Sequence, residues 1–369
     1  MGRVVPLSNT IPLVELSRAY GQPLASGVIR SVPEDFYVDE LLGFSPSGEG
    51  EHVFLQIEKR AISTFAVRDC LARLVGCRQM DIGYAGLKDK WALTRQWFSV
   101  YLPRGEEPDW AALSPEMLSV QLEDAEISVH TVARHNKKLR RGAHRGNRFR
   151  LRVREVAASC DDFVVALEGR LARLSVAGVP NYFGAQRFGR GEGNVDKARA
   201  MFARRQRLPR DQRSLYLSAA RSYLFNQILS QRIADRCWLD YLDGDVLILN
   251  GSRSHFVLDR RSPTAAADLA EVGERLEVGD IHLAASLCGS GESPLSSQAA
   301  ERERQVWQSS EDLYQGLRAA GVEWALRPMR VRPEALRWHF EGGDLTLGFE
   351  LPAGSYATVL LRELIEYED

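Results

Sequence analysis

The sequence predicts an α+β protein in which sheet-forming segments near both ends of the chain enclose a more helical middle. Alternating apolar and polar residues, the pattern of half-buried strands, occur within 27–58 and return in 327–350. Amphipathic helical patterns dominate 161–236 and 298–320, which lie between those regions. No internal repeat or low-complexity tract interrupts this order. The sequence therefore predicts a sheet-based domain that carries an insertion domain.

Length and composition narrow the class of protein. A chain of 369 residues suggests two domains, or one domain with a large insertion. No apolar run approaches the roughly 18 residues of a membrane span, and the N-terminus lacks the layout of a signal peptide. The five cysteines are scattered and form no CxxC pair, so neither a zinc site nor a disulfide framework is indicated. We expect a cytoplasmic protein with no metal and no membrane partner.

The first third of the chain predicts several strands and one helix. Ser63 is expected to cap a helix whose apolar side includes Val67, Cys70 and Leu71, and Gly76 is expected to end it. The predicted strands are 27–40, broken by Pro33, then 52–58, 80–85 and 96–101, with a turn at 43–50.

The loop between the last two of these strands carries the candidate catalytic residue. Asp89 lies in the segment GYAGLKDKWALTRQW, at 83–97, between Lys88 and Lys90. Two flanking cations favour the ionised carboxylate and attract a polyanion to it. The same residues also fit a solvated loop of alternating charge, and local physics alone favours neither interpretation.

Positive charge is concentrated in one stretch, although the net charge of the chain is only −1. Residues 134–154 contain ten Lys/Arg and no Asp/Glu, which is typical of a phosphate-binding face. The end of this stretch, 148–154, alternates strictly and predicts an antiparallel strand with its arginines outward. A solvated basic strand and loop is the alternative interpretation. Asn147 follows a glycine and fits a turn as well as a ligand, and Phe149 fits simple core packing.

The middle of the chain predicts helices, strands and one rigid loop. The loop, 178–190, is rich in glycine and aromatic residues and carries Arg187 and Arg190, which are available for phosphates. Its glycine run at 189–193 is not a dinucleotide-binding motif, because the spacing is wrong and no strand precedes it. The remaining predicted elements are helices at 161–176, 196–207, 215–236 and 298–320, strands at 244–249, 327–332 and 344–350, and a closing helix at 359–366.

Five motifs, in this order, resemble the TruD family of tRNA pseudouridine synthases over nearly the whole chain. They are PEDFYVDE at 33–40, GYAGLKDKWALTRQW at 83–97, RHNKKLRRGAHRGNRF at 134–149, VPNYFGAQRFG at 179–189 and LPAGSYATVLLREL at 351–364. The resemblance implies an isomerase that converts uridine to pseudouridine at position 13 of transfer RNA without a cofactor. It also implies a circularly permuted pseudouridine-synthase catalytic domain on a mainly antiparallel, mixed sheet (1–172 and 322–369), with a family-specific α/β insertion domain (173–321).

Residue by residue, the resemblance implies that Asp89 is the nucleophile and that Arg30 is its basic partner. It implies a uridine pocket lined by Phe36, Asn147, Phe149 and Tyr356. The residue at Tyr356 is often phenylalanine in the family, and many other pseudouridine synthase families have tyrosine in place of Phe149. The carboxylate can act by covalent capture or by taking a proton from the sugar, and the sequence leaves both routes open.

Transfer RNA is the expected partner, and we expect the protein to act as a monomer. The cations expected to contact RNA are Lys88, Lys90, Lys137, Lys138, Arg140, Arg141, Arg187 and Arg190. Two other classes of protein stay open at this point. An RNA-binding module or tRNA chaperone shares the basic footprint. A glycoside or nucleoside hydrolase usually needs two carboxylates in fixed roles, and no second acid lies near Asp89 in a comparable motif.

Overall fold

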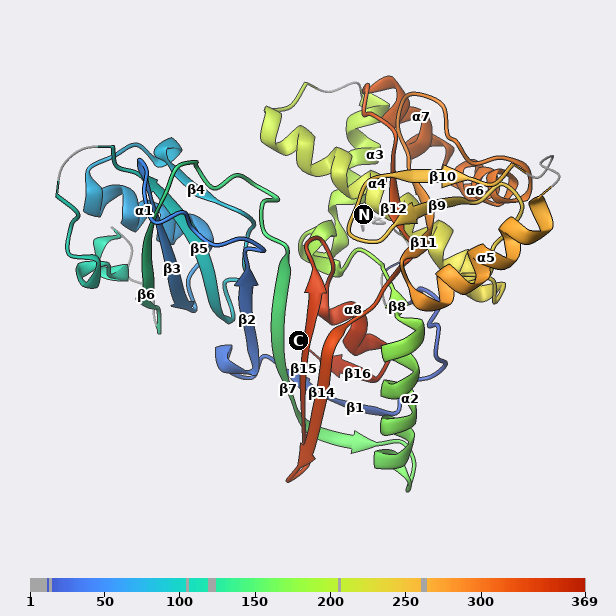
Figure 1. The fold of residues 1–369 in the computed structure, drawn as a ribbon, viewed down its shortest axis with the longest axis horizontal. Helices are drawn as coiled ribbons and strands as arrows, with labels where there is room; N and C mark the ends of the chain where they lie inside the picture. Colours follow the sequence, from blue (N-terminus) through green and yellow to red (C-terminus); the bar gives the residue numbers. More distant parts are fainter. Residues whose placement is uncertain are drawn as a thin grey trace, which may run out of the picture. The chain divides into compact units, whose positions relative to one another are not determined.

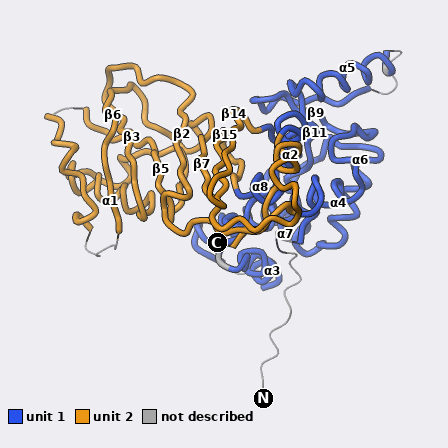
Figure 2. Tube along the Cα trace, turned by 90° about the horizontal axis from the view of Figure 1, so that it is seen from below, with its two compact units in different colours: residues 1–22, 172–332, 358–363 blue, residues 23–171, 333–357, 364–369 orange. Residues whose placement is uncertain are grey.

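The computed structural model describes residues 12, 15–103, 106–118, 124–204, 207–259 and 264–368. The chain forms two compact units, which Figure 2 distinguishes by colour. Unit 1 comprises Met1–Gln22, Ala172–Arg332 and Thr358–Glu363, and unit 2 comprises Pro23–Leu171, Pro333–Ala357 and Leu364–Asp369. The predicted insertion at 173–321 falls within the longest segment of unit 1, and its status as an insertion stays a prediction.

Unit 2 is built on a ten-stranded sheet (Figure 1). The central strand order is β14-β15-β7-β2-β5-β3-β6, with β4 beside β5 and with β1 between β7 and β16. The ladders are antiparallel except β1–β16 and β2–β5. The bounds are β1 Ala25–Ile29, β2 Phe36–Leu41, β3 His52–Arg60, β4 Ile82–Tyr84, β5 Leu93–Tyr101, β6 Glu126–His135, β7 Gly146–Ala158, β14 Glu334–Glu341, β15 Asp344–Pro352 and β16 Ile365–Glu368. A mixed, mainly antiparallel sheet next to helices confirms the predicted α+β class.

Helix α1 (Thr64–Val75) covers one face of this sheet. Its ends are as predicted: the Ser63 hydroxyl accepts a hydrogen bond from the Ala66 N–H at 3.1 Å, and Gly76 adopts a left-handed φ of 68°, which glycine tolerates without strain. The apolar side of the helix packs with Val53, Leu55 and Ile57 of β3 in one buried cluster. The opposite face of β3 is buried too, because Phe54 packs with Leu42, Ala85, Trp97 and Leu139.

Unit 1 combines helices with two small sheets. One sheet has the order β10-β9-β11-β12, and β8 pairs with β13 in the other. The strands are β8 Val179–Pro180, β9 Val246–Leu249, β10 His255–Val257, β11 Ile281–Leu287, β12 Ala325–Pro328 and β13 Arg330–Val331. The helices of the chain after α1 are α2 Phe163–Ala177, α3 Asn194–Arg204, α4 Arg210–Ala234, α5 Ala265–Val278, α6 Ser297–Ser309, α7 Glu311–Ala319 and α8 Ala357–Arg362. None of the helices in the described ranges is both long and apolar enough to cross a membrane.

The structure corrects several predicted elements. The helix predicted at 298–320 is broken at Ser310, whose φ of −136° and ψ of 45° are not helical. Two acids, Glu311 and Asp312, then occupy the first turn of α7, where the helix dipole favours negative charge. The closing helix ends at Arg362, and β16 follows it to pair with β1. That pairing joins residues more than 300 positions apart, so local periodicity could not reveal it.

Candidate active site

Asp89 lies in the loop that joins β4 to β5, next to the arginine expected as its partner. The Arg30 Nη2 atom lies 3.3 Å from Asp89 Oδ2, with side chains that are 9% and 28% exposed. The guanidinium also lies 4.2 Å from the centre of the Phe36 ring, close enough for a cation–π contact. Arg30 directly follows β1 with a φ of 55°, a left-handed conformation that is uncommon for a residue with a side chain. Unit 2 therefore brings Arg30, Phe36 and Asp89 together.

Buried polar side chains hold the backbone of this loop. The Lys59 ammonium donates to the carbonyl oxygens of Asp89, at 2.8 Å, and Ile62, at 2.7 Å. The Thr64 hydroxyl accepts from the Lys88 N–H at 3.0 Å, and the Gln96 amide donates to the Gly86 carbonyl at 2.6 Å. Lys59 is completely buried, and this desolvation lowers its pKa to about 7. Sequence reasoning missed Lys59, although its position continues the inward series of Val53, Leu55 and Ile57.

The two lysines beside Asp89 differ in their surroundings. The Lys88 ammonium is buried against the Glu40 carboxylate, which also accepts from the Trp97 N–H at 3.1 Å. Lys90 is exposed. Of the two lysines expected to contact RNA, Lys90 therefore faces solvent, whereas the Lys88 ammonium is occupied by Glu40; RNA contact by either lysine stays a prediction.

The residues expected around uridine lie on neighbouring strands of unit 2. Phe149 in β7 pairs with Phe349 in β15, with ring centres 5.5 Å apart, and its ring meets Phe36 edge-on at 6.4 Å. Asn147 lies two residues earlier on the same face of β7; it is 9% exposed. Among the described residues, its Oδ1 atom has no hydrogen-bond partner. Because buried amide oxygens are nearly always paired, this atom suits a ligand donor.

Tyr356 lies in the turn between β15 and α8 and is half-buried. The turn begins beside the first residues of β7, because the Ala353 N–H donates to the Arg145 carbonyl at 3.0 Å and Leu351 pairs with Asn147. The turn that carries Tyr356 therefore follows the strand residues that pair with the start of β7, where Asn147 lies. Contact of Tyr356 with a base stays a prediction.

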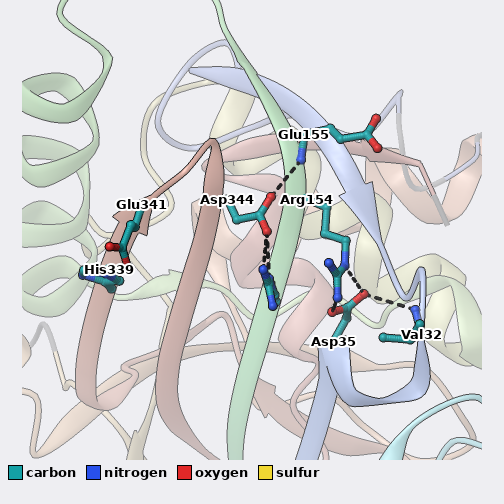
Figure 3. Close-up of polar contacts among 8 residues, drawn as sticks. Val32, Asp35, Arg154, Glu155, His339, Glu341 and Asp344 are labelled. Carbon is teal, nitrogen blue, oxygen red and sulfur yellow. Dashed lines mark hydrogen bonds and ion pairs between the residues drawn. The ribbon is translucent and has the colours of Figure 1, made fainter.

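The basic stretch divides into a neutralised strand and an exposed loop. Three outward arginines of β7 form ion pairs: Arg148 with Glu350 at 2.8 Å, Arg152 with Asp344 at 2.6 Å, and Arg154 with Asp35 at 2.8 Å. Figure 3 shows the Arg154–Asp35 pair and the further hydrogen bond that Asp35 accepts from the Val32 N–H at 3.1 Å. These carboxylates come from β15 and from the segment before β2. A count of charged residues within 134–154 could therefore not include them. The predicted cationic outer face is therefore largely paired.

Further cations of the stretch lie in the loop between β6 and β7, beside the loop of Asp89. Leu139 is buried there and its N–H donates to the Ser99 hydroxyl at 2.9 Å, while the Gly142 N–H donates to the Ala85 carbonyl at 2.7 Å. Arg141 donates to the Tyr84 hydroxyl at 2.9 Å, and Lys138 donates to the Met80 carbonyl. We call this segment, 136–142, the basic loop; its cations are Lys137, Lys138, Arg140 and Arg141.

The remaining expected RNA contacts belong to unit 1. Arg187 donates to the Ser218 hydroxyl at 3.0 Å, and its guanidinium lies 5.3 Å from the centre of the Phe183 ring. Arg190 begins the 3-10 turn Arg190–Glu192, and its side chain lies outside the described part of the chain. The residues that the structure describes contain no group of three or more His, Cys, Asp or Glu side chains arranged to hold a metal.

Comparisons with known proteins identify the family. The profile of the family "tRNA pseudouridine synthase D (TruD)" matches residues 17–197 and 194–364. A tRNA pseudouridine synthase D from Methylococcus capsulatus is 43% identical over 96% of this chain and 95% of its own length. One from Aeromonas salmonicida is 42% identical over 97% of this chain and 96% of its own length. A crystal structure assigned to the same family, from Methanosarcina mazei, superposes with a TM-score of 0.67 at 24% identity, covering 95% of this chain and 96% of that chain, and so supports the fold. By sequence over nearly its whole length, this chain belongs to the tRNA pseudouridine synthase D family.

Proposed function

We propose that the protein is a tRNA pseudouridine synthase that isomerises uridine at position 13 of transfer RNA, with Asp89 as the catalytic carboxylate. The names of its relatives support pseudouridine synthesis in transfer RNA. The observation that carries the site assignment is the Arg30–Asp89 pair, whose guanidinium lies over the Phe36 ring; the Phe36 ring in turn meets the Phe149 ring edge-on. A monomer in the cytoplasm, working without a cofactor, completes the proposal.

The reaction requires no net redox change. The N1–C1′ bond of uridine breaks, the uracil turns, and a C5–C1′ bond forms, while N1 gains a proton and C5 loses one. The ionised Asp89 serves this exchange either by attacking C1′ or by removing a proton from the sugar. Arg30 supplies a charge-assisted partner that holds the carboxylate in place.

The aromatic residues of the site offer stacking surfaces for the uracil base once it has left the RNA helix. A nucleotide that reacts at its own base must be taken out of the helix and held by stacking and hydrogen bonds. The Phe36 ring contacts Arg30, the partner of Asp89, and the Phe149 ring packs edge-on against Phe36. The unpaired Asn147 Oδ1 can accept a hydrogen bond from the N3–H of uracil. Asn147 is therefore suited to recognise the hydrogen-bonding edge of the base.

Asp89→Asn is the direct test, with Asp81→Asn as a matched control. Asp81 is an aspartate of the same unit that pairs with Arg78 at 2.9 Å, away from Arg30. Transfer RNA labelled with tritium at uridine C5 reports isomerisation by tritium release, and carbodiimide mapping locates the product. We expect release from wild type and Asp81→Asn, none from Asp89→Asn, and RNA affinities within about threefold of each other, because phosphate contacts dominate binding.

Three outcomes would contradict the proposal. Turnover by Asp89→Asn would remove Asp89 from the chemistry. Free uracil in place of pseudouridine would indicate a hydrolase. Tight RNA binding by wild type with no release would favour an RNA-binding module or chaperone.

A further inference from the structure

Trp91 is a large apolar side chain that stays exposed beside the candidate site. Trp91 follows Asp89 by two positions in the sequence and is 47% exposed. The indole edge is nevertheless fixed, because Nε1 donates to the Arg30 carbonyl at 3.0 Å. The residue that pairs with Asp89 therefore also fixes the orientation of Trp91.

The surroundings of Trp91 combine apolar surface with positive charge. Leu87, in the same loop, is 57% exposed, and Phe65 is 42% exposed. Phe65 directly follows Thr64, whose hydroxyl accepts from the Lys88 N–H, so the start of α1 adjoins this loop. Lys90 is exposed between Asp89 and Trp91. Exposed apolar side chains of this size near a candidate site are typical of a contact surface.

Charge decides between the possible occupants of this surface. An apolar protein partner would have to desolvate Lys90 and the partly exposed Asp89–Arg30 pair, which is unfavourable without matching charges. A nucleotide has both groups that complement this surface, namely a π face that stacks on the indole and a phosphate that pairs with the cations. Stacking on an aromatic ring tolerates any base, because every base has a π face.

We propose that Trp91 is a stacking platform for an RNA base that neighbours the uridine held at Asp89. This inference rests on the proposed function, since it takes RNA as the substrate. The platform adds affinity and fixes the RNA register relative to Asp89, whereas the reacting atoms are contacted by other residues. Trp91 is therefore a binding residue, and its removal acts on RNA affinity more than on the chemical step.

Two substitutions separate the ring from its hydrogen bond. Trp91→Ala removes both, and Trp91→Phe keeps an aromatic face while losing the Nε1 donor to Arg30. We expect Trp91→Ala to raise the Kd and KM for transfer RNA about 5- to 150-fold, the range of base–aromatic stacking, with kcat at saturation within about twofold. Trp91→Phe should stay within about threefold of wild type. Tyr101→Ala, which truncates another exposed aromatic residue of unit 2 at the end of β5, is the matched control and should change neither constant.

A transfer RNA lacking one base identifies the stacked nucleotide. Removal of the base on the 5′ or the 3′ side of the target should weaken wild-type binding on one side only. That loss should not add to the loss from Trp91→Ala, because both changes delete the same contact. Full additivity on both sides, or a wild-type Kd for Trp91→Ala, would overturn the proposal. Loss of kcat with unchanged Kd in both Trp91 variants would mean that Trp91 only positions Arg30. Failure of wild type to release tritium would instead refute the proposed function, while the binding measurements still report on stacking.

Discussion

The Lys59 ammonium donates to the backbone carbonyl of Asp89 at 2.8 Å from a side chain that is completely buried. It also donates to the Ile62 carbonyl at 2.7 Å, so one lysine joins the end of β3 to the loop of Asp89. Burying an ammonium is unfavourable, and the lowered pKa of Lys59 reflects that burial. The unfavourable desolvation of Lys59, next to Asp89, indicates that the loop needs to be held rigidly.

Lys59→Met should therefore lower kcat with little effect on RNA binding. The substitution leaves two carbonyls without their donor and frees the loop, and a displacement of about 1 Å can cost about 100-fold in rate. We expect kcat to fall about 10- to 100-fold and Kd to change less than about threefold. Leu71→Ala, a truncation in the adjacent apolar cluster, controls for lost stability, which should be about 2–5 kcal/mol there. Equal kcat losses in the two variants would show that Lys59 acts only through stability.

Arg30→Ala should reduce kcat at least about tenfold, and Arg30→Lys should restore part of the loss. Removing one partner of a fully buried ion pair costs about 3–5 kcal/mol, but Asp89 is 28% exposed, so solvent screening makes the effect smaller. Single-turnover rates with saturating RNA measure it. A normal rate for Arg30→Ala would exclude the pair from the reaction.

The salt dependence of RNA binding should follow the basic loop and not the arginines of β7. Replacing Lys137, Lys138, Arg140 and Arg141 by glutamine should lower the slope of log K against log salt by up to ~0.9 for each lost duplex phosphate contact. Arg148→Gln with Arg152→Gln is the control, because these side chains are paired with Glu350 and Asp344. Filter binding at several salt concentrations compares the salt slopes of the basic-loop variant and the control. A larger change in the control would place the RNA on the strand face.

Unit 1 should lose stability as the pH rises through about 7, because of Glu303. This carboxyl is fully buried, accepts from the Ser286 N–H at 2.9 Å, and has its pKa raised by desolvation to about 7. The folded state therefore holds the proton more tightly than the unfolded state, so the stabilisation is complete below about pH 4.5 and declines through about pH 7. Glu303→Gln should remove this decline, whose slope is at most about 1.4 kcal/mol per pH unit. Urea unfolding at pH 5 to 8 measures it, and equal pH slopes in both proteins would contradict the prediction.

Features that depend on neighbours in sequence could be predicted, and those that depend on distant segments could not. Ser63 and Gly76 bound α1 as expected because capping is local. The alternation of β7 was correct, but the carboxylates that pair with Arg148 and Arg152 come from β15, nearly 200 residues away. The Arg30–Asp89 contact joins two distant segments that only the family resemblance related. Trp91 and Lys59 were overlooked because a tryptophan in a loop and a lysine in a strand look ordinary until exposure and burial are known.

The parallel pairing of β1 with β16 has a consequence for synthesis of the chain. Ile365 in β16 pairs with Ala25, and Glu368 pairs with Val28, so this edge of β1 is covered only after a segment more than 300 residues later in the chain has been made. On a ribosome, β1 can pair with its antiparallel neighbour β7 as soon as that strand emerges, but its other edge stays open until residues 365–368 emerge as well. Open strand edges invite pairing with other chains. A stalled or truncated product would therefore expose the strand that leads into Arg30, and aggregation during synthesis should begin at that edge.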